Sequence, residues 1–394
     1  MLIDSFSLID FITINTIDEL DSYSPQIDDF VNSERVCSNV YHQSDYLKSL
    51  FLNSPDFSYW EVCIVQYKNE IIGIIPSYIQ RKKVPVKFSV YRLFSFDLRV
   101  LQFSGSRVAF VESLPEEGIT HIIKNQLLRI QSPFDLAFIE SLTIDDSLFR
   151  CFNGIDKYIL KSASINPDII HSIDFPDNWD SYLSSMSKKR RYNLKRNIKV
   201  LEKEFGDKVF FKSYEKIEDV LVFLSHLDEI YSNTWQAKTL GAKKRSGSVN
   251  HILDDVMAKS GCFLGYILFI DNKAVAFIRG YLHKGLYYFE EIGFDMAWSK
   301  YNVGNALNMM MLENLMSQSV QANNLDFGYG DNIYKQVLGN RKVFAINAYL
   351  YKRFSKASLI VFLIRSSNKV YSIIKINIEK FGLTEKVRRL IKHR

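Results

Sequence analysis

The sequence predicts an α/β protein with two similar domains, followed by a basic helical tail. Its 394 residues exceed the size of one typical core, and 47% of them are hydrophobic, which supports ordered globular structure. A similar strand–turn–strand pattern occurs once in each half of the chain. Between residues 290 and 335 the second half also shows the order strand, turn, helix and strand, which forms one αβ unit.

Each half of the chain contains a predicted β-hairpin with an asparagine in its turn. Apolar stretches at residues 60–67 and 71–76 flank the first turn, and stretches at 263–270 and 274–278 flank the second. Asn69 and Asn272 suit such turns. A further apolar stretch, 286–292, follows the second hairpin. Chance likeness between two hairpins is the alternative, and we favour a duplicated architecture.

The predicted helix after this last strand begins at a glycine and offers a binding site for an anion. The backbone N–H groups in the first turn of a helix have no partner within the helix, and the helix dipole is positive at that end. We expect a phosphate-bearing cofactor at Asn302, Val303, Gly304, Asn305 and Ala306, with Gly304 allowing the ligand to approach closely.

This turn resembles the acyl-CoA-binding turn of the GNAT acetyltransferases, Q/R-x-x-G-x-G/A. Gly304-Asn305-Ala306 matches its G-x-A part, whereas Tyr301 stands where Gln or Arg is usual. From about Tyr41 to Arg353 the chain resembles the BioF2-like or CelD-like branch, which is related to the Fem aminoacyl transferases. The features that carry this resemblance are the basic helix at 187–203, the turn at 295–304, and Asp326-Phe327-Gly328-x-Gly330 followed by Tyr334-Lys335.

The resemblance implies two tandem GNAT-like acyltransferase domains, each with a mixed central sheet flanked by helices. We expect an N-terminal domain at residues 1–165, an acyltransferase domain at 166–355 and a basic amphipathic tail at 356–394. The turn Asn166-Pro167-Asp168 marks the first boundary. No glycine-rich helix start follows the first hairpin, so we expect the first domain to support the second.

Acyl transfer from a thioester to an amine needs a base for the amine and a proton for the departing thiolate. The catalytic candidates are Glu290, Glu291, Asp326 and Tyr334. Adjacent strand residues face opposite sides, so at most one of the two glutamates is expected to face the substrate, and the choice stays open. A surface salt bridge for the glutamates and a strand-end cap for Asp326 are the structural alternatives.

Seven basic residues and no acidic residue lie between Lys188 and Lys199. Helical spacing aligns Arg191, Lys195 and Lys199, either as an anion-binding stripe or as a solvated helix face. We take Arg191 and Lys195 as substrate-binding candidates. The family resemblance adds Trp235 and Lys335, for which a core tryptophan and a surface lysine are the alternatives.

The cysteines, the N-terminus and the apolar runs indicate where in the cell the protein is located. Four widely spaced cysteines, without a C-x-x-C pair or clustered histidines, indicate neither a metal site nor disulfides, and a reducing cytoplasm fits them. The acidic start lacks the features of a secretory signal. The longest apolar run near the C-terminus, 357–364, has eight residues, so no membrane-spanning helix is expected.

The basic end of the chain indicates an anionic partner. Residues 1–60 hold ten acidic and two basic residues, whereas 341–394 hold fourteen basic and two acidic ones. Apolar residues recur at helical spacing beyond residue 369, which predicts an amphipathic helix. The inner face of the membrane, nucleic acid and an acidic subunit are the possible partners.

We therefore expect a cytoplasmic, acyl-CoA-dependent N-acyltransferase, with peripheral attachment to the inner face of the membrane as the alternative location. The predicted acceptor is a small anionic amine, such as an amino-sugar nucleotide or lipid-linked sugar in cell-surface polysaccharide biosynthesis, and acetyl is the expected acyl group. No cysteine or serine has the neighbours of an activated nucleophile, which favours direct transfer. The alternatives are a Fem-like transferase that uses aminoacyl-tRNA on a peptidoglycan precursor and a non-catalytic scaffold.

Overall fold

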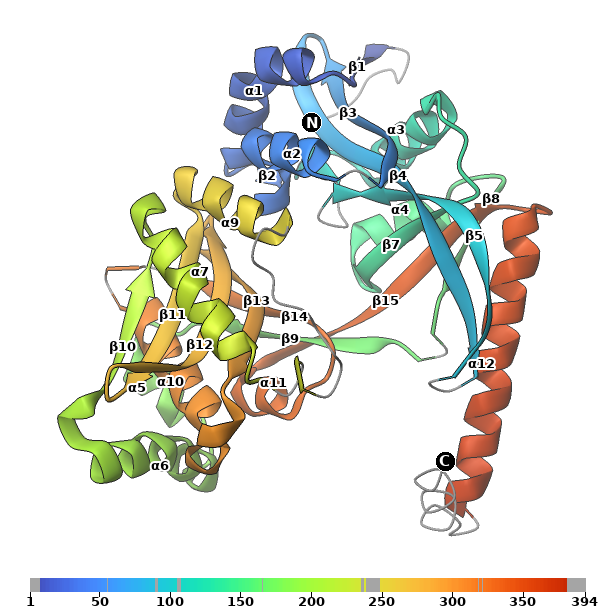
Figure 1. Cartoon of the computed structure of the whole chain (residues 1–394). Coiled ribbons are helices and arrows are strands. Elements are labelled where there is room, and N and C mark those ends of the chain that lie inside the picture. The colour runs from blue at the N-terminus through green and yellow to red at the C-terminus, as the bar shows by residue number, and fades with distance from the viewer. Residues whose placement is uncertain are drawn as a thin grey trace. The chain divides into compact units, whose positions relative to one another are not determined.

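The computed structural model describes residues 8–54, 56–88, 91–104, 108–164, 166–234, 237–238, 249–317, 319–320 and 322–380 (Figure 1). The described residues divide into two units. The first unit takes its residues from Met1–Asn15, Pro55–Asp168 and Phe344–Arg394, and the second from Thr16–Ser54 and Ile169–Val343.

Both units are discontinuous in sequence, in contrast to the contiguous domains expected at 1–165 and 166–355. The break between Asp168 and Ile169 falls at the expected turn. The segment Thr16–Ser54, however, belongs to the second unit, and the chain from Phe344 onward belongs to the first. Composition and turn signals along the chain do not report these long-range assignments.

The first unit contains a mixed sheet with strand order β1-β3-β4-β5-β7-β15. The pairs β1–β3, β3–β4, β4–β5 and β7–β15 are antiparallel, and β5–β7 is parallel. Its elements are β1 (Ile9–Ile14), β3 (Phe57–Tyr67), β4 (Glu70–Phe88), β5 (Tyr91–Phe103), β6 (Ala109–Val111), α3 (Glu116–Arg129), β7 (Leu136–Thr143), α4 (Ser147–Asn153), β8 (Tyr158–Ser162), β15 (Arg341–Lys352) and α12 (Lys356–Lys380).

The second unit contains a mixed sheet with strand order β10-β11-β12-β13-β14-β9. Its strands are β9 (Asp168–Asp174), β10 (Val209–Tyr214), β11 (Phe263–Ile270), β12 (Lys273–His283), β13 (Leu286–Phe294) and β14 (Asn324–Tyr329), with the short β2 (Val36–Cys37). Its helices are α1 (Ile17–Asn32), η2 (Val40–His42), α2 (Ser44–Leu52), α5 (Trp179–Ser184), α6 (Lys188–Phe205), η4 (Gly206–Lys208), α7 (Ile217–Tyr231), α9 (Val249–Lys259), η5 (Met296–Tyr301), α10 (Val303–Leu315) and α11 (Ile333–Leu338).

The two sheets follow the same path, which supports the predicted duplication. In each, an antiparallel run of four strands is followed by a helix and a parallel strand: α3 precedes β7, and α10 precedes β14. Both predicted hairpins are present. Each turn has two residues with positive φ, Lys68 and Asn69 in the first, Asp271 and Asn272 in the second, as tight hairpins require. The predicted mixed α/β fold class is confirmed.

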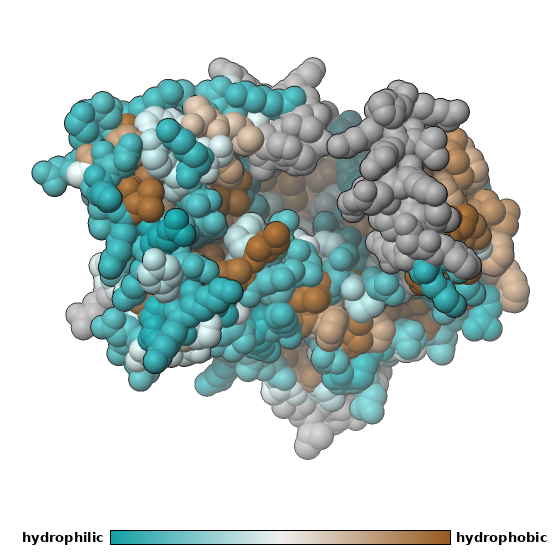
Figure 2. Space-filling view, turned by 90° about the horizontal axis from the view of Figure 1, so that it is seen from below, coloured by the Kyte–Doolittle hydropathy of each residue, from teal (hydrophilic) through white to brown (hydrophobic). Residues whose placement is uncertain are grey.

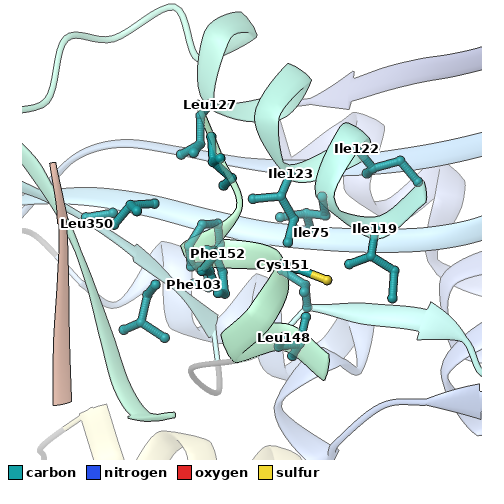
Figure 3. Close-up of a cluster of buried hydrophobic side chains, with 14 of the residues drawn as sticks. Ile75, Phe103, Ile119, Ile122, Ile123, Leu127, Leu148, Cys151, Phe152 and Leu350 are labelled. Atoms are coloured by element: carbon teal, nitrogen blue, oxygen red, sulfur yellow. The ribbon is translucent and has the colours of Figure 1, made fainter. Parts of the chain in front are cut away.

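Helices and strands of the first unit enclose one large apolar cluster (Figure 3). Ile119, Ile122, Ile123 and Leu127 of α3 pack with Leu148, Cys151 and Phe152 of α4 and with Ile75 and Phe103 of the sheet. Phe152 and Phe103 lie with ring centroids 5.7 Å apart.

Both faces of the second sheet are covered by apolar side chains. One face carries a cluster that includes Tyr266, Tyr287 and Leu307 of α10, and the other a cluster that includes Phe263, Phe277 and Phe223 of α7. All eight residues of β11 are therefore buried, as expected for a central strand covered on both sides.

The C-terminal helix α12 is longer than the apolar run at 357–364. That run was too short to predict a membrane-spanning helix. Among the described residues, one segment, Lys356–Ile374 of α12, is long and apolar enough to cross a membrane by length and composition, and 22% of that window is buried. The core helix of a soluble protein passes the same test.

We predict that Phe152→Ala lowers the free energy of unfolding by about 3–5 kcal/mol, because it leaves a cavity among packed side chains. Leu128, on the solvent side of α3, is 63% exposed, and Leu128→Ala should change it by less than about 0.5 kcal/mol. Urea unfolding monitored by circular dichroism measures both. Equal effects of the two substitutions would contradict the assigned core.

Candidate active site

The start of α10 leaves backbone N–H groups open at the end of a buried helix. Asn302 adopts a left-handed conformation (φ 53°, ψ 40°) and makes no side-chain capping hydrogen bond to the helix. The first α-helical hydrogen bond runs from Ala306 N to Asn302 O, at 3.1 Å. The N–H groups of Val303, Gly304 and Asn305 precede it and lie at the positive end of the helix dipole.

Gly304 packs closely against the sheet. A methyl group at Gly304 would lie 3.2 Å from Cδ1 of Phe294 and 3.8 Å from Cδ1 of Ile292. Val303 and Ala306 are also fully buried, whereas Asn302 and Asn305 are exposed. Of the five residues predicted at this turn, Asn305 is the one whose side chain lines a cavity.

A cavity of ≈ 630 Å³ lies among α6, the start of α10 and α11. Polar side chains on one wall face apolar ones on another. Its lining is Ser187, Lys189, Arg190, Asn193, Leu194, Asn197, Asn305, Ile333, Tyr334, Val337 and Leu338. The cavity thus brings together two predicted residues, Asn305 and Tyr334, with basic and amide side chains of α6.

The side of α6 that faces this cavity differs from the predicted stripe. Leu194 and Leu201 are buried in the core, so the residues one turn from Leu194, such as Arg190 and Asn197, lie on the inner side. Lys195 and Lys199 are exposed. Arg191 is half-buried, and neither it nor Lys195 lines the cavity.

Arg190 lines the cavity, and one of its hydrogen-bond donors has no acceptor among the described residues. Its Nη2 donates to the carbonyl of Gly339 at 3.5 Å, while its Nε is buried and has no hydrogen-bond partner within the described residues. A buried donor of this kind costs free energy unless a ligand or water accepts from it. Together with Lys189 and the start of α10, Arg190 makes this end of the cavity suited to phosphate.

Tyr334 forms the aromatic wall of the cavity. Its ring centroid lies 5.9 Å from that of Phe327 on β14 and 6.1 Å from that of Phe289 on β13. Burial raises the pKa of Tyr334 to about 12, so its hydroxyl stays protonated at neutral pH. The predicted Tyr334 therefore offers a proton, not a base.

Both Glu290 and Glu291 face Arg279, although adjacent residues of a regular strand face opposite sides of the sheet. The register of β12 with β13 shifts between Arg279 and Gly280, pairing Arg279 with Glu291 and Gly280 with Phe289. Glu290 is the extra residue of this bulge. Oε2 of Glu290 lies 3.7 Å from Nη2 of Arg279, and Oε2 of Glu291 lies 3.7 Å from its Nε.

The Arg279 guanidinium is the centre of a buried cluster of acidic and tyrosine side chains. Asp254 of α9 lies 2.7 Å from its Nη1, and Tyr281 Oη donates to the same Asp254 oxygen at 2.6 Å. Tyr41 Oη donates to Glu290. Burial acts to lower the pKa of Arg279, but Tyr281, Asp254 and the glutamates outweigh it and raise that pKa well above its usual range.

Residues 188–336 match the family described as acetyltransferase (GNAT) domain. This segment is a GNAT acetyltransferase domain. The chain is thus an acyltransferase of the GNAT fold. None of the curated proteins matches the sequence.

Solved structures with the same fold extend the likeness over most of the chain. A crystal structure of FemX is 12% identical, covers 90% of this chain and 100% of its own, and has a TM-score of 0.59. The C-terminal domain of a putative lysylphosphatidylglycerol synthetase from Agrobacterium fabrum is 10% identical, with coverages of 88% and 95% and a TM-score of 0.52. A conserved protein of unknown function from Bacteroides thetaiotaomicron is 11% identical, with coverages of 87% and 100% and a TM-score of 0.52. At these identities the likeness shows the fold.

Asp326 and Lys335 of the GNAT domain hold the end of β14. Asp326 Oδ1 accepts from the N–H of Gly328 at 2.8 Å, which fits the strand-end alternative for this residue. Lys335 is buried, not a surface lysine, and its Nζ donates to the carbonyls of Gly328 and Tyr329 at 3.2 and 3.1 Å. Burial lowers the pKa of Lys335, and Asp326 opposes that shift.

The arginine cluster went unpredicted because its members are far apart in sequence. Arg279, Asp254 and Tyr41 carry no motif spacing, although Arg279 stands out as a charge inside an apolar strand pattern. Trp235, a predicted substrate-binding residue, lies outside the described residues. Within the described ranges there is no group of three or more His, Cys, Asp or Glu side chains able to hold a metal ion.

We predict that Arg279→Met lowers the free energy of unfolding by about 3–5 kcal/mol, since three carboxylates would lose their buried counter-charge. Arg341, 60% exposed in its side chain, is the matched control, and Arg341→Met should change stability by less than about 0.5 kcal/mol. Chemical unfolding of both variants at neutral pH tests this. Wild-type stability of Arg279→Met would show that the cluster does not depend on its guanidinium.

Proposed function

We propose that this chain transfers an acetyl group from acetyl-CoA to the amine of a small anionic acceptor, such as a nucleotide- or lipid-linked amino sugar. The observation that carries the proposal is the cavity at the start of α10, where Lys189, Arg190 and Asn305 converge. The acceptor class and the link to cell-surface polysaccharide rest on the family resemblance.

The residues around the cavity fit the phosphates of acyl-CoA. Phosphate oxygens can accept hydrogen bonds from the backbone N–H groups of Val303–Asn305 and from the buried Nε of Arg190. Lys189 adds a positive charge to the same cavity. When bound there, acyl-CoA supplies the activated thioester. Tyr334, packed against Phe289 and Phe327, then offers an aromatic wall suited to its acyl-bearing arm.

The acidic cluster suits the acceptor amine. The cluster has three carboxylates, from Asp254, Glu290 and Glu291, and one guanidinium, from Arg279. Two negative charges therefore remain, and they attract an ammonium group. The side chains of Glu290 and Glu291 are 28% and 15% exposed. Either carboxylate can accept the proton that the amine loses on attack. Tyr41 orients Glu290 through its hydroxyl.

The cavity and the cluster lie on opposite faces of β13, so the proposed transfer takes place at an edge of this strand. Tyr287 and Phe289 pack in the cluster on the α10 face, and Tyr288 packs on the other. β13 pairs with β14 from Leu286 to Tyr288, and β13 continues to Phe294. In this proposal the thioester and the amine meet beside the part of β13 that extends past Tyr288.

Protons move in two places in this proposal. The amine gives its proton to Glu290 or Glu291, which makes it nucleophilic, and Tyr334 gives a proton to the sulfur as the carbon–sulfur bond breaks. Because Tyr334 keeps its proton at neutral pH, it can act as this acid. Lys195 and Lys199, exposed on the outer side of α6, suit attraction of an anionic acceptor.

Binding of acetyl-CoA, measured by isothermal titration, tests the cofactor site. We expect Asn305→Asp, which places a negative charge in the cavity at the helix start, and Lys189→Gln to weaken binding by about tenfold or more. Asn153→Asp, an exposed position at the end of α4, makes the same charge change and should leave binding unchanged. Equal binding by all three variants would remove the cofactor from this cavity.

Turnover assays test the catalytic roles. With amino-sugar nucleotides as acceptors and release of free CoA thiol as the readout, Glu290→Gln, Glu291→Gln and Tyr334→Phe identify the base and the acid. Loss of the true base should lower kcat by about 100-fold or more without a matching loss of acetyl-CoA binding. Full activity of all three variants would refute the assigned chemistry. Absence of turnover with every acyl-CoA, together with transfer from aminoacyl-tRNA, would favour the Fem-like alternative.

A further inference from the structure

We propose that the first unit docks on an anionic phospholipid surface through the outer face of α12 and the adjoining β4–β5 hairpin. The proposal does not rest on the acyl-transfer chemistry. The sequence indicated only a basic tail at the membrane. The surface proposed here is folded and has both apolar and basic side chains, and we call the outer face of α12 together with the β4–β5 hairpin the docking face.

Helix α12 has two apolar sides, and one of them is covered by the sheet. Ala357, Ile360, Val361 and Ile364 are buried against a cluster that includes Val84, Val86 and Leu98 of the hairpin. Arg365 donates to the carbonyl of Ser162 at 2.6 Å and Asn368 to that of Ala163 at 3.0 Å. These contacts hold the inner side of α12 on its own unit.

The opposite side of α12 exposes large apolar side chains. With the 3.6-residue repeat, Leu359, Phe362, Val370, Ile373 and Ile374 fall on one stripe, and all five are exposed, Phe362 by 64%. A surface helix normally carries polar residues on this side. Hydrophobic side chains gather on the right of Figure 2, the side on which α12 lies in Figure 1.

The β4–β5 hairpin continues this surface. Ser367 of α12 donates to the carbonyl of Lys87 at 2.7 Å, and the rings of Phe88 and Tyr371 lie 5.5 Å apart, so hairpin and helix are neighbours. Just beyond the turn, Tyr91, Leu93 and Phe94 are exposed. The same exposure of large side chains therefore occurs on two adjacent elements.

Phe354 adds to the exposure at the start of α12. It occupies a left-handed position, with φ of 58°, which is unfavourable for a bulky side chain, and it is 94% exposed. Insertion of the ring among lipid acyl chains would bury it.

Basic residues accompany these apolar side chains. Residues 81–99 and 352–380 together hold thirteen Lys or Arg and two Asp or Glu. Lys87, Arg92, Lys356, Lys369 and Lys380 are exposed among them. Exposed apolar side chains flanked by cations match the interface of an anionic bilayer, in which both acyl chains and phosphates are within reach.

The occupied inner side of α12 favours contact along the bilayer surface over a complete span. A spanning helix would have to leave Val84, Val86 and Leu98, which it covers. In the proposed mode the helix keeps these contacts, and only its outer stripe enters the interface. A second copy of the chain is the competing occupant, but like-charged basic rims would repel each other there.

Flotation of the full chain with vesicles tests the proposal. We expect binding to vesicles that mix phosphatidylcholine with phosphatidylglycerol, at least tenfold weaker binding to phosphatidylcholine alone, and partial loss of binding as salt rises, because screening leaves the apolar contribution. Failure of the full chain to float with anionic vesicles at low salt would overturn it.

Substitutions separate the docking face from the rest of the surface. Phe362→Ser with Ile373→Ser should reduce flotation at least tenfold, and Lys356→Glu with Lys369→Glu should abolish the preference for phosphatidylglycerol. Leu221→Ser, at a position 74% exposed on α7, and Lys216→Glu, at an exposed position, are the matched controls and should float as the wild type does. Thermal unfolding by circular dichroism confirms that each variant is folded.

Two outcomes would contradict the docking face. Equal loss of flotation in the docking-face variants and their controls would show that binding is not local. Sedimentation of the wild type as a dimer that Phe362→Ser with Ile373→Ser converts to a monomer, without flotation of either, would assign the surface to contact between copies of the chain.

Discussion

The bulge between β12 and β13 is the constraint on which the acidic cluster depends. In a regular strand, Glu290 and Glu291 would point to opposite faces of the sheet, and one carboxylate would enter the apolar α10 side. The extra residue turns both toward Arg279. Gly280 makes the irregular pairing possible, since a methyl group there would lie 2.4 Å from the Tyr287 ring and 2.5 Å from the Tyr288 carbonyl.

The bulge also explains how one strand serves two environments. On one face of β13, Phe289 belongs to an apolar cluster beside a cavity that ends at the start of α10. On the other face, Arg279 and three carboxylates form a charged cluster enclosed by tyrosines. Arg279 and Asp254 are buried, and a buried charge is costly unless it is paired, so each of the two depends on the other.

The predictability of each part follows from the range of the interactions that determine it. The hairpins and the start of α10 depend on local turn residues, Asn69, Asn272 and Asn302, and could be located from the sequence. Which side of α6 faces inward depends on which of its leucines are buried in the core. For this reason Arg190 lines the cavity, whereas the sequence pattern had indicated Arg191. The pairing of Arg279 with Asp254 and the recruitment of Thr16–Ser54 into the second unit depend on tertiary contacts that no local pattern encodes.

The central claim is that α10 and α6 together bind the phosphates of acyl-CoA. Hydrogen–deuterium exchange of the full chain with and without CoA tests it most directly, because it reports the backbone amides at Val303–Asn305 themselves. We expect slower exchange in peptides that cover residues 188–197 and 302–307, and little change in peptides of the first unit. Unchanged exchange at the start of α10 at saturating CoA, or protection confined to other segments, would contradict it.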